Sequence, residues 1–152
     1  MPIDCPSAYV VDGDTIRCGS ERVRLLGIDA PELHGCRSGR TCVSGDGAAS
    51  RRSLVGALRF GRVRYTIITR DRYGRAVSQV WAGSTDLSCY QAQRSQAVYK
   101  PRWDTGAILR ASCRTSFSGR KRTVCYPAPD GSKWSFVQPS WGRLISNHRT
   151  RS

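Results

Sequence analysis

The chain of 152 residues is long enough for a single domain with its own hydrophobic core, and its 25 basic and 11 acidic residues give a formal charge of +14. Nearly all of this positive charge is arginine, since lysine occurs only at Lys100, Lys121 and Lys133. Arginine binds phosphate through a planar fork of donors and stays charged when partly buried, so the composition indicates a polyanionic partner, nucleic acid before an anionic membrane surface. No apolar run approaches the roughly 20 residues that cross a bilayer, which argues against stable membrane insertion.

Three strands are predicted before residue 30. The first runs from about residue 7 to Val11, and Asp12-Gly13-Asp14 then predicts a hairpin, because Asp-Gly between β-type runs is a strong turn signal. The second strand covers residues 15–18, and the third covers residues 22–28.

The apolar alternation of the third strand slips at Leu25-Leu26. Such a slip indicates either a β-bulge or a strand that is buried on both faces. It also gives Arg24 the same parity as Leu26 and Ile28, so we expect Arg24 to face the concave side of a sheet rather than open solvent.

The third strand is predicted to end in a rigid corner, Asp29-Ala30-Pro31-Glu32, with a carboxylate on each side. Pro31 cannot donate to a sheet, and it restricts Ala30 to extended conformations.

A loop over residues 34–47 follows the corner and contains Cys36 and Cys42. A local disulfide between these two cysteines would staple the loop, which would lie beside the corner and could shape substrate access. His34 suits acid–base chemistry by its ordinary pKa, but a single surface histidine is more often incidental.

Two helices are predicted from their first residues. Asp46 is a candidate N-cap for a helix over residues 47–60, and Asp86 is one for a helix over residues 87–97. The segment Tyr99-Lys100-Pro101 ends the second helix.

Two more strands, residues 63–68 and 76–81, lie between the helices and are joined by the turn Asp71-Arg72-Tyr73-Gly74-Arg75. The whole order of about five strands and two or three helices predicts a mainly β fold with helices packed outside. A small closed β-barrel of oligonucleotide-binding type, an OB-fold, fits this count and order.

The character of the chain changes near Arg114, which predicts one domain over residues 1–113 and a basic tail over residues 114–152. The tail has little periodicity, and its 8 basic residues against 1 acidic residue carry half of the total charge. Trp134, Phe136 and Trp141 lie among these charges. The tail either grips nucleic acid by phosphate pairing and base stacking or is weakly ordered without a specific function.

The seven cysteines, at positions 5, 18, 36, 42, 89, 113 and 125, are many for this length. There is no Cys-x-x-Cys pair and there are only two histidines, which argues against zinc. Disulfides are the better interpretation, and they predict a secreted or periplasmic protein. The opening residues 1–4 do not form a signal peptide, so either a leader is missing from this chain or the cysteines are reduced.

The acidic residues of the first strands suit a metal ion. Asp14 and Asp29 end neighbouring strands and could converge on one cation, with the backbone carbonyl of Ala30 as a further ligand. Hard oxygen ligands favour one Ca²⁺, or Mg²⁺, over zinc.

The remaining requirements of phosphodiester hydrolysis are an activated water and a cationic clamp on the phosphate. Glu32 could act as general base on a water bound to that ion, and Arg24 and Arg75 could clamp the phosphate. Taken singly, each residue is explained by a turn, a strand end or a solvated face. Taken together they favour a site, because clustered carboxylates are costly unless a cation joins them.

Three motifs carry a resemblance to a known family. The segments DGDTIRCGSERVRLLGIDAPE, DRYGR and DLSCYQAQRSQAVYKPRWD resemble the staphylococcal nuclease (thermonuclease) family over about residues 7–113. The resemblance implies a five-stranded OB-fold barrel with helices and a Ca²⁺-dependent phosphodiesterase that cleaves DNA and RNA.

The same resemblance implies roles for individual residues. Asp14 and Asp29 resemble the metal ligands, Glu32 the catalytic glutamate, and Arg24 and Arg75 the two arginines on the scissile phosphate. Residues implied to bind the nucleotide are Tyr73 and Tyr99, with Arg72 and Lys100 beside them. Pro101 falls where the family can carry a cis peptide bond.

The chain departs from the family's type member in three places. Ala30 replaces a threonine, which matters little if the backbone carbonyl is the ligand. The loop of Cys36 and Cys42 resembles an insertion of a cysteine-bearing bacterial branch, in which Cys89 with Cys113, and Cys5 with Cys18, also resemble pairs and Cys125 is left over. Residues 114–152 lie outside the resemblance.

The sequence therefore predicts a monomeric Ca²⁺-dependent nuclease acting on DNA and RNA, with single strands preferred. The alternative is a non-catalytic OB-fold module that binds single-stranded nucleic acid, although a module that had lost catalysis should have gaps in the site, and none is found. A cationic protein acting on membranes is a third hypothesis, which an amphipathic basic helix in the tail would have supported.

Overall fold

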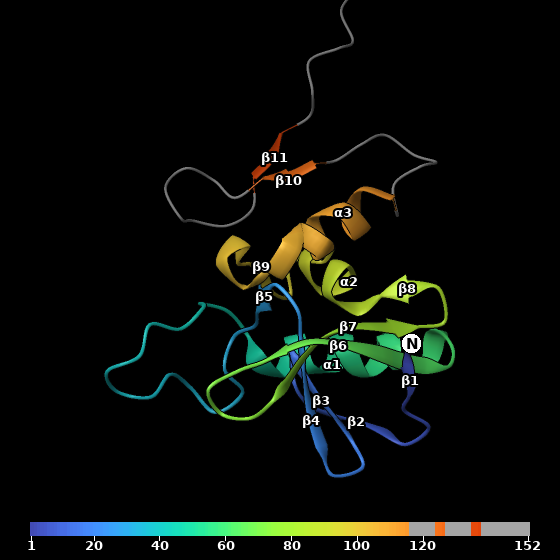
Figure 1. The fold of residues 1–152 in the computed structure, drawn as a ribbon. Coiled ribbons are helices and arrows are strands. Elements are labelled where there is room, and N and C mark those ends of the chain that lie inside the picture. Colours follow the sequence, from blue (N-terminus) through green and yellow to red (C-terminus); the bar gives the residue numbers. More distant parts are fainter. Residues whose placement is uncertain (116–123, 127–134, 138–152) are drawn as a thin grey trace, which may run out of the picture.

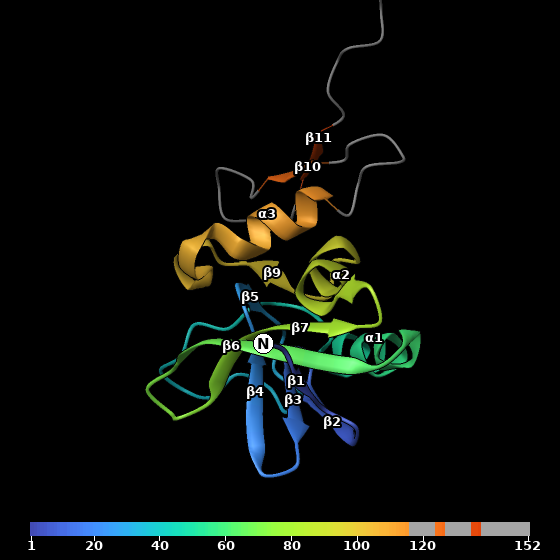
Figure 2. The ribbon, with the colours of Figure 1, turned by 45° about the vertical axis from the view of Figure 1, so that its right-hand side comes forward.

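A curled β-sheet with helices packed around it forms the body of the protein (Figures 1 and 2). This computed structural model describes residues 1–115, 124–126 and 135–137. Within them, the strand order of the main sheet is β1-β6-β7-β4-β3-β2, with β8 paired to β7. The strands are β1 (Ile3–Asp4), β2 (Ala8–Asp12), β3 (Thr15–Cys18), β4 (Glu21–Leu25), β6 (Val63–Arg70), β7 (Ala76–Ala82) and β8 (Thr85–Asp86).

The mainly β fold with helices outside, predicted from the sequence, is confirmed, and the sheet is a curled half-barrel. All neighbouring strands are antiparallel except β4 and β7, which are parallel. The path of the main sheet is open, and this half-barrel is consistent with the predicted fold of OB type. Two short strands, β5 (Ile28–Asp29) and β9 (Val98–Tyr99), pair with each other instead of extending it.

The predicted hairpin between β2 and β3 is confirmed, and it lies against the first helix. The backbone N–H of Asp14 donates to Asp12 Oδ1 at 3.1 Å, and the pairing register shifts between Val10 and Asp12. A Cβ atom added at Gly13 would lie 1.9 Å from Ser50 Oγ, so only glycine allows the helix to approach this turn so closely.

The third predicted strand is shorter than expected, and the slip at Leu25-Leu26 marks its end. β4 stops at Leu25, and Gly27, at φ +72°, turns the chain so that β5 leaves the main sheet. The register between β3 and β4 has no bulge, and Leu25 and Leu26 are both 1% exposed. The prediction of a β-bulge is therefore wrong, because Leu26 is not an extra residue of the strand but part of the buried turn that follows it.

The two predicted helices are present, with small differences at their ends. α1 (Gly47–Ala57) starts at the predicted cap, where Asp46 accepts from the N–H of Ala49, and it continues as a 3-10 helix, η1 (Leu58–Phe60). α2 (Leu87–Gln93) ends four residues before the predicted Ala97, because Ser95 takes a positive φ of 57° and closes the last turn.

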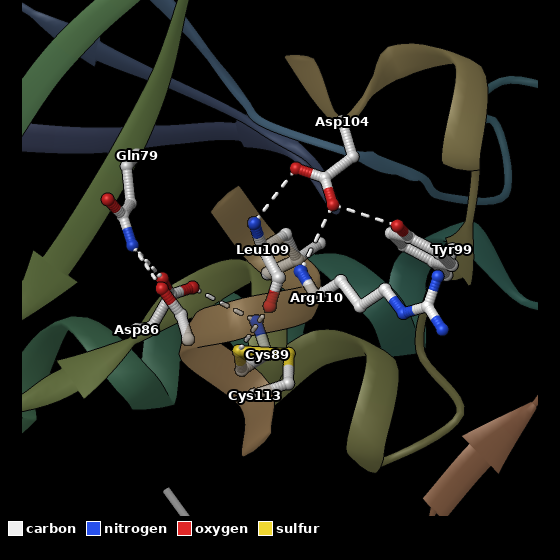
Figure 3. Close-up of a disulfide and its surroundings, with 9 residues drawn as sticks. Gln79, Asp86, Cys89, Tyr99, Asp104, Leu109, Arg110 and Cys113 are labelled. Atoms are coloured by element: carbon white, nitrogen blue, oxygen red, sulfur yellow. Dashed lines mark hydrogen bonds between the residues drawn. A yellow bond between two sulfur atoms is a disulfide. The ribbon is translucent and has the colours of Figure 1, made fainter. Parts of the chain in front are cut away.

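A third helix, α3 (Ile108–Thr115), was not located from the sequence. Two short 3-10 turns, η2 (Pro101–Trp103) and η3 (Thr105–Ala107), precede it. Asp104 accepts hydrogen bonds from the N–H groups of Leu109 and Arg110 at 2.8 and 3.0 Å, and so satisfies the first turn of α3 (Figure 3). The Lys100–Pro101 bond is trans, in contrast to the cis bond that the resemblance allowed.

Three disulfides connect the pairs that were predicted: Cys5–Cys18, Cys36–Cys42 and Cys89–Cys113. The third joins α2 to α3 (Figure 3). These bonds are compatible with an oxidising compartment. No helix of the described residues is long and apolar enough to cross a membrane.

The basic tail is described at two short strands, β10 (Val124–Tyr126) and β11 (Ser135–Val137), which pair antiparallel. α3 continues two residues beyond the predicted domain boundary at residue 113. Trp134 and Trp141, to which base stacking was assigned, lie outside the described residues.

Candidate active site

Asp14 links the β2–β3 hairpin to the corner that follows β5. Its side chain is buried, with the residue 4% exposed. Oδ1 accepts from the Thr15 hydroxyl and Oδ2 accepts from the N–H of Ala30, both at 2.9 Å. The structure therefore brings together Asp14 and Ala30, which are sixteen residues apart in the chain.

Arg24 lies between two of the predicted carboxylates. Its NH2 atom is 3.2 Å from Asp14 Oδ2 and 3.2 Å from Asp29 Oδ1, and its side chain is 15% exposed. Arg24 is thus largely withdrawn from solvent, as predicted. Its guanidinium carbon is also 5.1 Å from the ring centroid of Trp103, in cation–π geometry.

Six predicted site residues line one hollow of about 290 Å³. They come from the hairpin, β4, the corner and the β6–β7 turn, and they are Asp14, Arg24, Ala30, Glu32, Tyr73 and Arg75. Four charged residues without a predicted role in the site also line the hollow: Asp12, Arg22, Arg37 and Arg40. Carboxylates and arginines from distant segments therefore face the same space.

The β6–β7 turn holds Arg75 in place through Asp71. Asp71 Oδ1 accepts from the N–H groups of Tyr73 and Arg75 at 2.9 and 3.0 Å, and Oδ2 accepts from Arg75 Nε at 2.7 Å. Burial raises the pKa of Asp71, but the hydrogen bonds from Arg75 and the backbone outweigh it and leave the pKa lowered. The ion pair fixes the guanidinium at the edge of the hollow.

A second, larger hollow of about 660 Å³ adjoins the first and shares Arg24, Glu32, Arg40, Tyr73 and Arg75 with it. Two of its lining residues are exposed aromatic side chains, Tyr73 at 62% and Trp103 at 44%.

Cations lie over both of these rings. Arg72 and Arg75 are 4.9 and 5.5 Å from the Tyr73 centroid. Lys100 is 5.9 Å from the Trp103 centroid, on a ring that Arg24 also approaches. Trp103 was missed from the sequence, although an aromatic residue next to the basic segment from Lys100 to Arg102 was the available signal.

Tyr99 and Lys100 line neither hollow. The Tyr99 hydroxyl donates to Asp104 Oδ2 at 2.8 Å, and burial together with this carboxylate raises the pKa of Tyr99 to about 12 (Figure 3). The backbone N–H of Lys100 donates to the carbonyl of Gly27, while its ammonium lies near Trp103. Arg72 lines the larger hollow only.

The acidic cluster is electrostatically crowded. Burial and the neighbouring negative charge of Asp14 raise the pKa of Asp12 to about 6. Burial and then Asp14 also raise the pKa of Asp29, against the opposing charges of Arg24 and Lys100. A cation bound here would relieve this repulsion, so the oxygen donors fit a hard divalent ion.

The described side chains do not by themselves complete a metal site. No group of three or more His, Cys, Asp or Glu side chains that could hold an ion occurs in the part of the chain that the structure describes. Backbone carbonyl and water oxygens would have to supply the rest of the shell, as they commonly do for Ca²⁺ and Mg²⁺.

Glu32 is the most accessible of the predicted carboxylates in the smaller hollow. Its side chain is 40% exposed, and Oε1 lies 3.8 Å from Arg40 NH2. His34, two residues further on, lines neither hollow.

Comparison with known proteins identifies the family. Residues 22–105 match the family described as staphylococcal nuclease homologue. The chain is 39% identical over 108 residues to the thermonuclease of Staphylococcus intermedius, covering 66% of this chain and 62% of that protein. It is 32% identical over 115 residues to the succinoglycan biosynthesis protein ExoI of Rhizobium meliloti (strain 1021), covering 74% of this chain and 60% of that protein.

The chain thus spans about three fifths of the length of both relatives. The matched region contains all of β4 except its first residue, the corner and the β6–β7 turn, which carry most of the residues around the smaller hollow. The chain belongs to the staphylococcal nuclease homologue family, a family of nuclease type.

Proposed function

We propose that this protein is a Ca²⁺-dependent nuclease that hydrolyses phosphodiester bonds of DNA and RNA. One observation carries the proposal: Asp14, Glu32, Arg24 and Arg75 all line one hollow of about 290 Å³. Family membership and the likeness to a thermonuclease support the same reaction.

The arginines supply the phosphate clamp. Arg75 donates through Nε to Asp71, and the ion pair orients its guanidinium before substrate arrives. Arg24 bridges Asp14 and Asp29, so it presents positive charge from the wall formed by β4. Charge-assisted hydrogen bonds from both side chains would stabilise the negative charge that grows on the phosphate oxygens in the transition state.

Asp14 and Asp29 would hold the ion, with the backbone carbonyl of Ala30 beside them. Their oxygens lie at the same distance from one nitrogen of Arg24, and hard oxygen donors suit Ca²⁺, with Mg²⁺ as the other candidate. A bound Ca²⁺ would stabilise charge on the phosphate and make an attacking water more acidic.

Glu32 would accept the proton of the attacking water. Its side chain is accessible within the hollow, and its contact with Arg40 is loose at 3.8 Å. The water oxygen forms the new bond to phosphorus, and the ester oxygen leaves with the electrons of the broken bond and then takes up a proton.

The larger hollow would hold the adjoining nucleotide. Bases of an unpaired strand can stack on Tyr73 and Trp103, while paired bases cannot reach these rings, which supports a preference for single strands. Arg72 lines this hollow and would contact the substrate there. Lys100, whose ammonium lies near Trp103, and Tyr99, which donates to Asp104, would support the site without lining either hollow. The three disulfides support a secreted or periplasmic protein, and we expect a monomer.

A digestion assay tests the proposal. Single- and double-stranded DNA and RNA are incubated with the protein in Ca²⁺, in Mg²⁺, or in excess EGTA. We expect cleavage in Ca²⁺, faster on single strands, and none in EGTA. Undiminished cleavage in EGTA would refute the metal assignment. Binding of single strands without cleavage in any metal would instead support the non-catalytic OB-fold module.

A further inference from the structure

The loop that Cys36 and Cys42 close brings extra positive charge to the proposed site. Arg37 and Arg40 line the smaller hollow, and Arg40 also lines the larger one. The segment from Gly35 to Cys42 contains these two arginines and no acidic residue. The proposed hydrolysis already has its phosphate clamp in Arg24 and Arg75, so the loop arginines need a different explanation.

Both arginines project from a tight, cross-linked turn. The Cys36–Cys42 disulfide spans six residues, and inside it the N–H of Arg40 donates to the carbonyl of Arg37 at 3.2 Å. Cys36 Sγ also lies 3.2 Å from the carbonyl oxygen of Arg40. The cross-link reduces the conformations open to the turn, so the two guanidiniums lose less entropy when they bind a ligand.

The partners that these arginines have in the protein are weak. Arg40 meets Glu32 at 3.8 Å, with side chains 56% and 40% exposed, and such an exposed pair contributes little in water. Among the residues that the structure describes, Arg37 makes no ion pair. A phosphate group, which accepts two parallel hydrogen bonds from a guanidinium, would therefore compete easily for both.

The loop faces the turn that carries Arg75. The larger hollow is lined on one part by Arg40, Thr41 and Cys42 and on another by residues of the β6–β7 turn. In Figures 1 and 2 the loop before α1 and the β6–β7 turn lie on the same side of the body. A strand whose scissile phosphate lies at Arg24 and Arg75 would thus continue past the loop.

We propose that Arg37 and Arg40 form a second phosphate subsite, which binds a phosphodiester neighbouring the one that is cleaved. The proposal rests on the proposed nuclease function and names its substrate class: an oligonucleotide with several phosphates, in preference to a dinucleotide. The arginines are specificity-determining residues and take no part in the chemical step.

The test compares the double variant Arg37→Ala/Arg40→Ala with Arg59→Ala, which removes an arginine of η1 that lines neither hollow. Binding of a single-stranded oligothymidylate is measured in EGTA over a range of salt. Losing one or two phosphate contacts should reduce the slope of log K against log salt by about 0.7 to 1.4. Arg59→Ala should leave the slope unchanged.

Cleavage in Ca²⁺ then separates this subsite from the scissile phosphate. In the double variant, KM for the oligonucleotide should rise about tenfold, the scale of a lost hydrogen bond to a charged group, while KM for a dinucleotide, which is too short to reach the loop, stays unchanged. Because Arg40 also contacts Glu32, the comparison is made on KM and not on kcat. If the wild type cleaves and the double variant has the same slope and KM as the wild type, the subsite is overturned and the nuclease proposal stands. An equal loss on the dinucleotide would also overturn it, and a wild-type protein that neither binds nor cleaves would overturn both.

Discussion

Two regions of this protein hold buried or half-buried aspartates near a disulfide, and the charged partners of these aspartates differ between the two. In the region between α2 and α3, Asp86 accepts from the N–H of Cys89 and from Gln79, and Asp104 accepts from two backbone N–H groups and the Tyr99 hydroxyl (Figure 3). At the hollows, Asp14 also accepts from neutral donors, but it shares one guanidinium nitrogen of Arg24 with Asp29, which lines the larger hollow, and Asp12 lines the smaller hollow near Asp14.

The difference teaches how to tell a structural carboxylate from a functional one. Asp104 has a separate neutral donor for each of its contacts, so its charge is satisfied by the helix start that it caps. Burial raises the pKa of Asp86 as it does those of Asp12 and Asp29, so the direction of the pKa does not separate the two regions. What separates them is that Asp14 and Asp29 share a single charged donor, the guanidinium of Arg24. Two carboxylates that share one cation leave negative charge that a ligand can neutralise.

The largest expected effect is on stability, and it comes from a change confined to the region between α2 and α3. Replacing Cys89 and Cys113 by serine should lower the free energy of unfolding by about 3 kcal/mol, because the disulfide closes a loop of 24 residues. Turnover per folded molecule should not change. Urea unfolding and the rate below the unfolding midpoint measure both quantities.

The matched control is Cys36→Ser/Cys42→Ser, whose loop of six residues should cost about 1 kcal/mol less than the other pair. In this control the affinity for oligonucleotide should fall, because the loop carries Arg37 and Arg40, while the free energy of unfolding should change less than it does without the Cys89–Cys113 bond. If removal of the Cys89–Cys113 bond reduced turnover at temperatures where the protein is folded, the separation between the two regions would fail.

The converse experiment changes one side chain of the smaller hollow and leaves the region between α2 and α3 unchanged. Glu32→Gln should reduce turnover by about 100-fold or more, the scale for losing a general base, while the midpoint of thermal unfolding stays within a degree or two of the wild type. The stability should survive because the Glu32 side chain is 40% exposed and its contact with Arg40 is loose. Single-stranded DNA should still bind in EGTA, and wild-type turnover of this variant would remove Glu32 from the mechanism.

The two regions also differ in how far the sequence predicted them. The hairpin at Asp12–Asp14 and the caps Asp46 and Asp86 are local signals, so they were placed correctly. α3 was missed because its cap, Asp104, stands before an intervening 3-10 turn and because the helix has only eight residues. The end of β4 was missed because Gly27 turns the chain inside an apolar run.

Within the hollow, the residues carried by motifs were predicted, and those carried by irregular segments were not. Arg24 and Arg75 belong to motifs of the family, yet they line the same hollow because β4 pairs in parallel with β7, which begins directly after Arg75. Arg37 and Arg40 lie in a loop without periodicity, and Trp103 ends a 3-10 turn, so nothing in the local pattern gave their direction. Contacts of this kind depend on tertiary packing rather than on spacing.

The smallest expected effect sharpens the boundary between the two regions, because Trp103 stands immediately before Asp104. Trp103→Ala should weaken the binding of single-stranded DNA in EGTA about tenfold, since stacking of one base contributes about 1–3 kcal/mol. Trp103→Phe should keep most of the affinity, because it preserves an aromatic face at the larger hollow. Either change should lower the free energy of unfolding only by the packing that a half-exposed ring contributes. Asp104→Ala, in contrast, should destabilise the fold by about 1 kcal/mol, because the cap of α3 is lost. Equal affinity of wild type and Trp103→Ala would assign Trp103 to the structural region, as a support for Arg24.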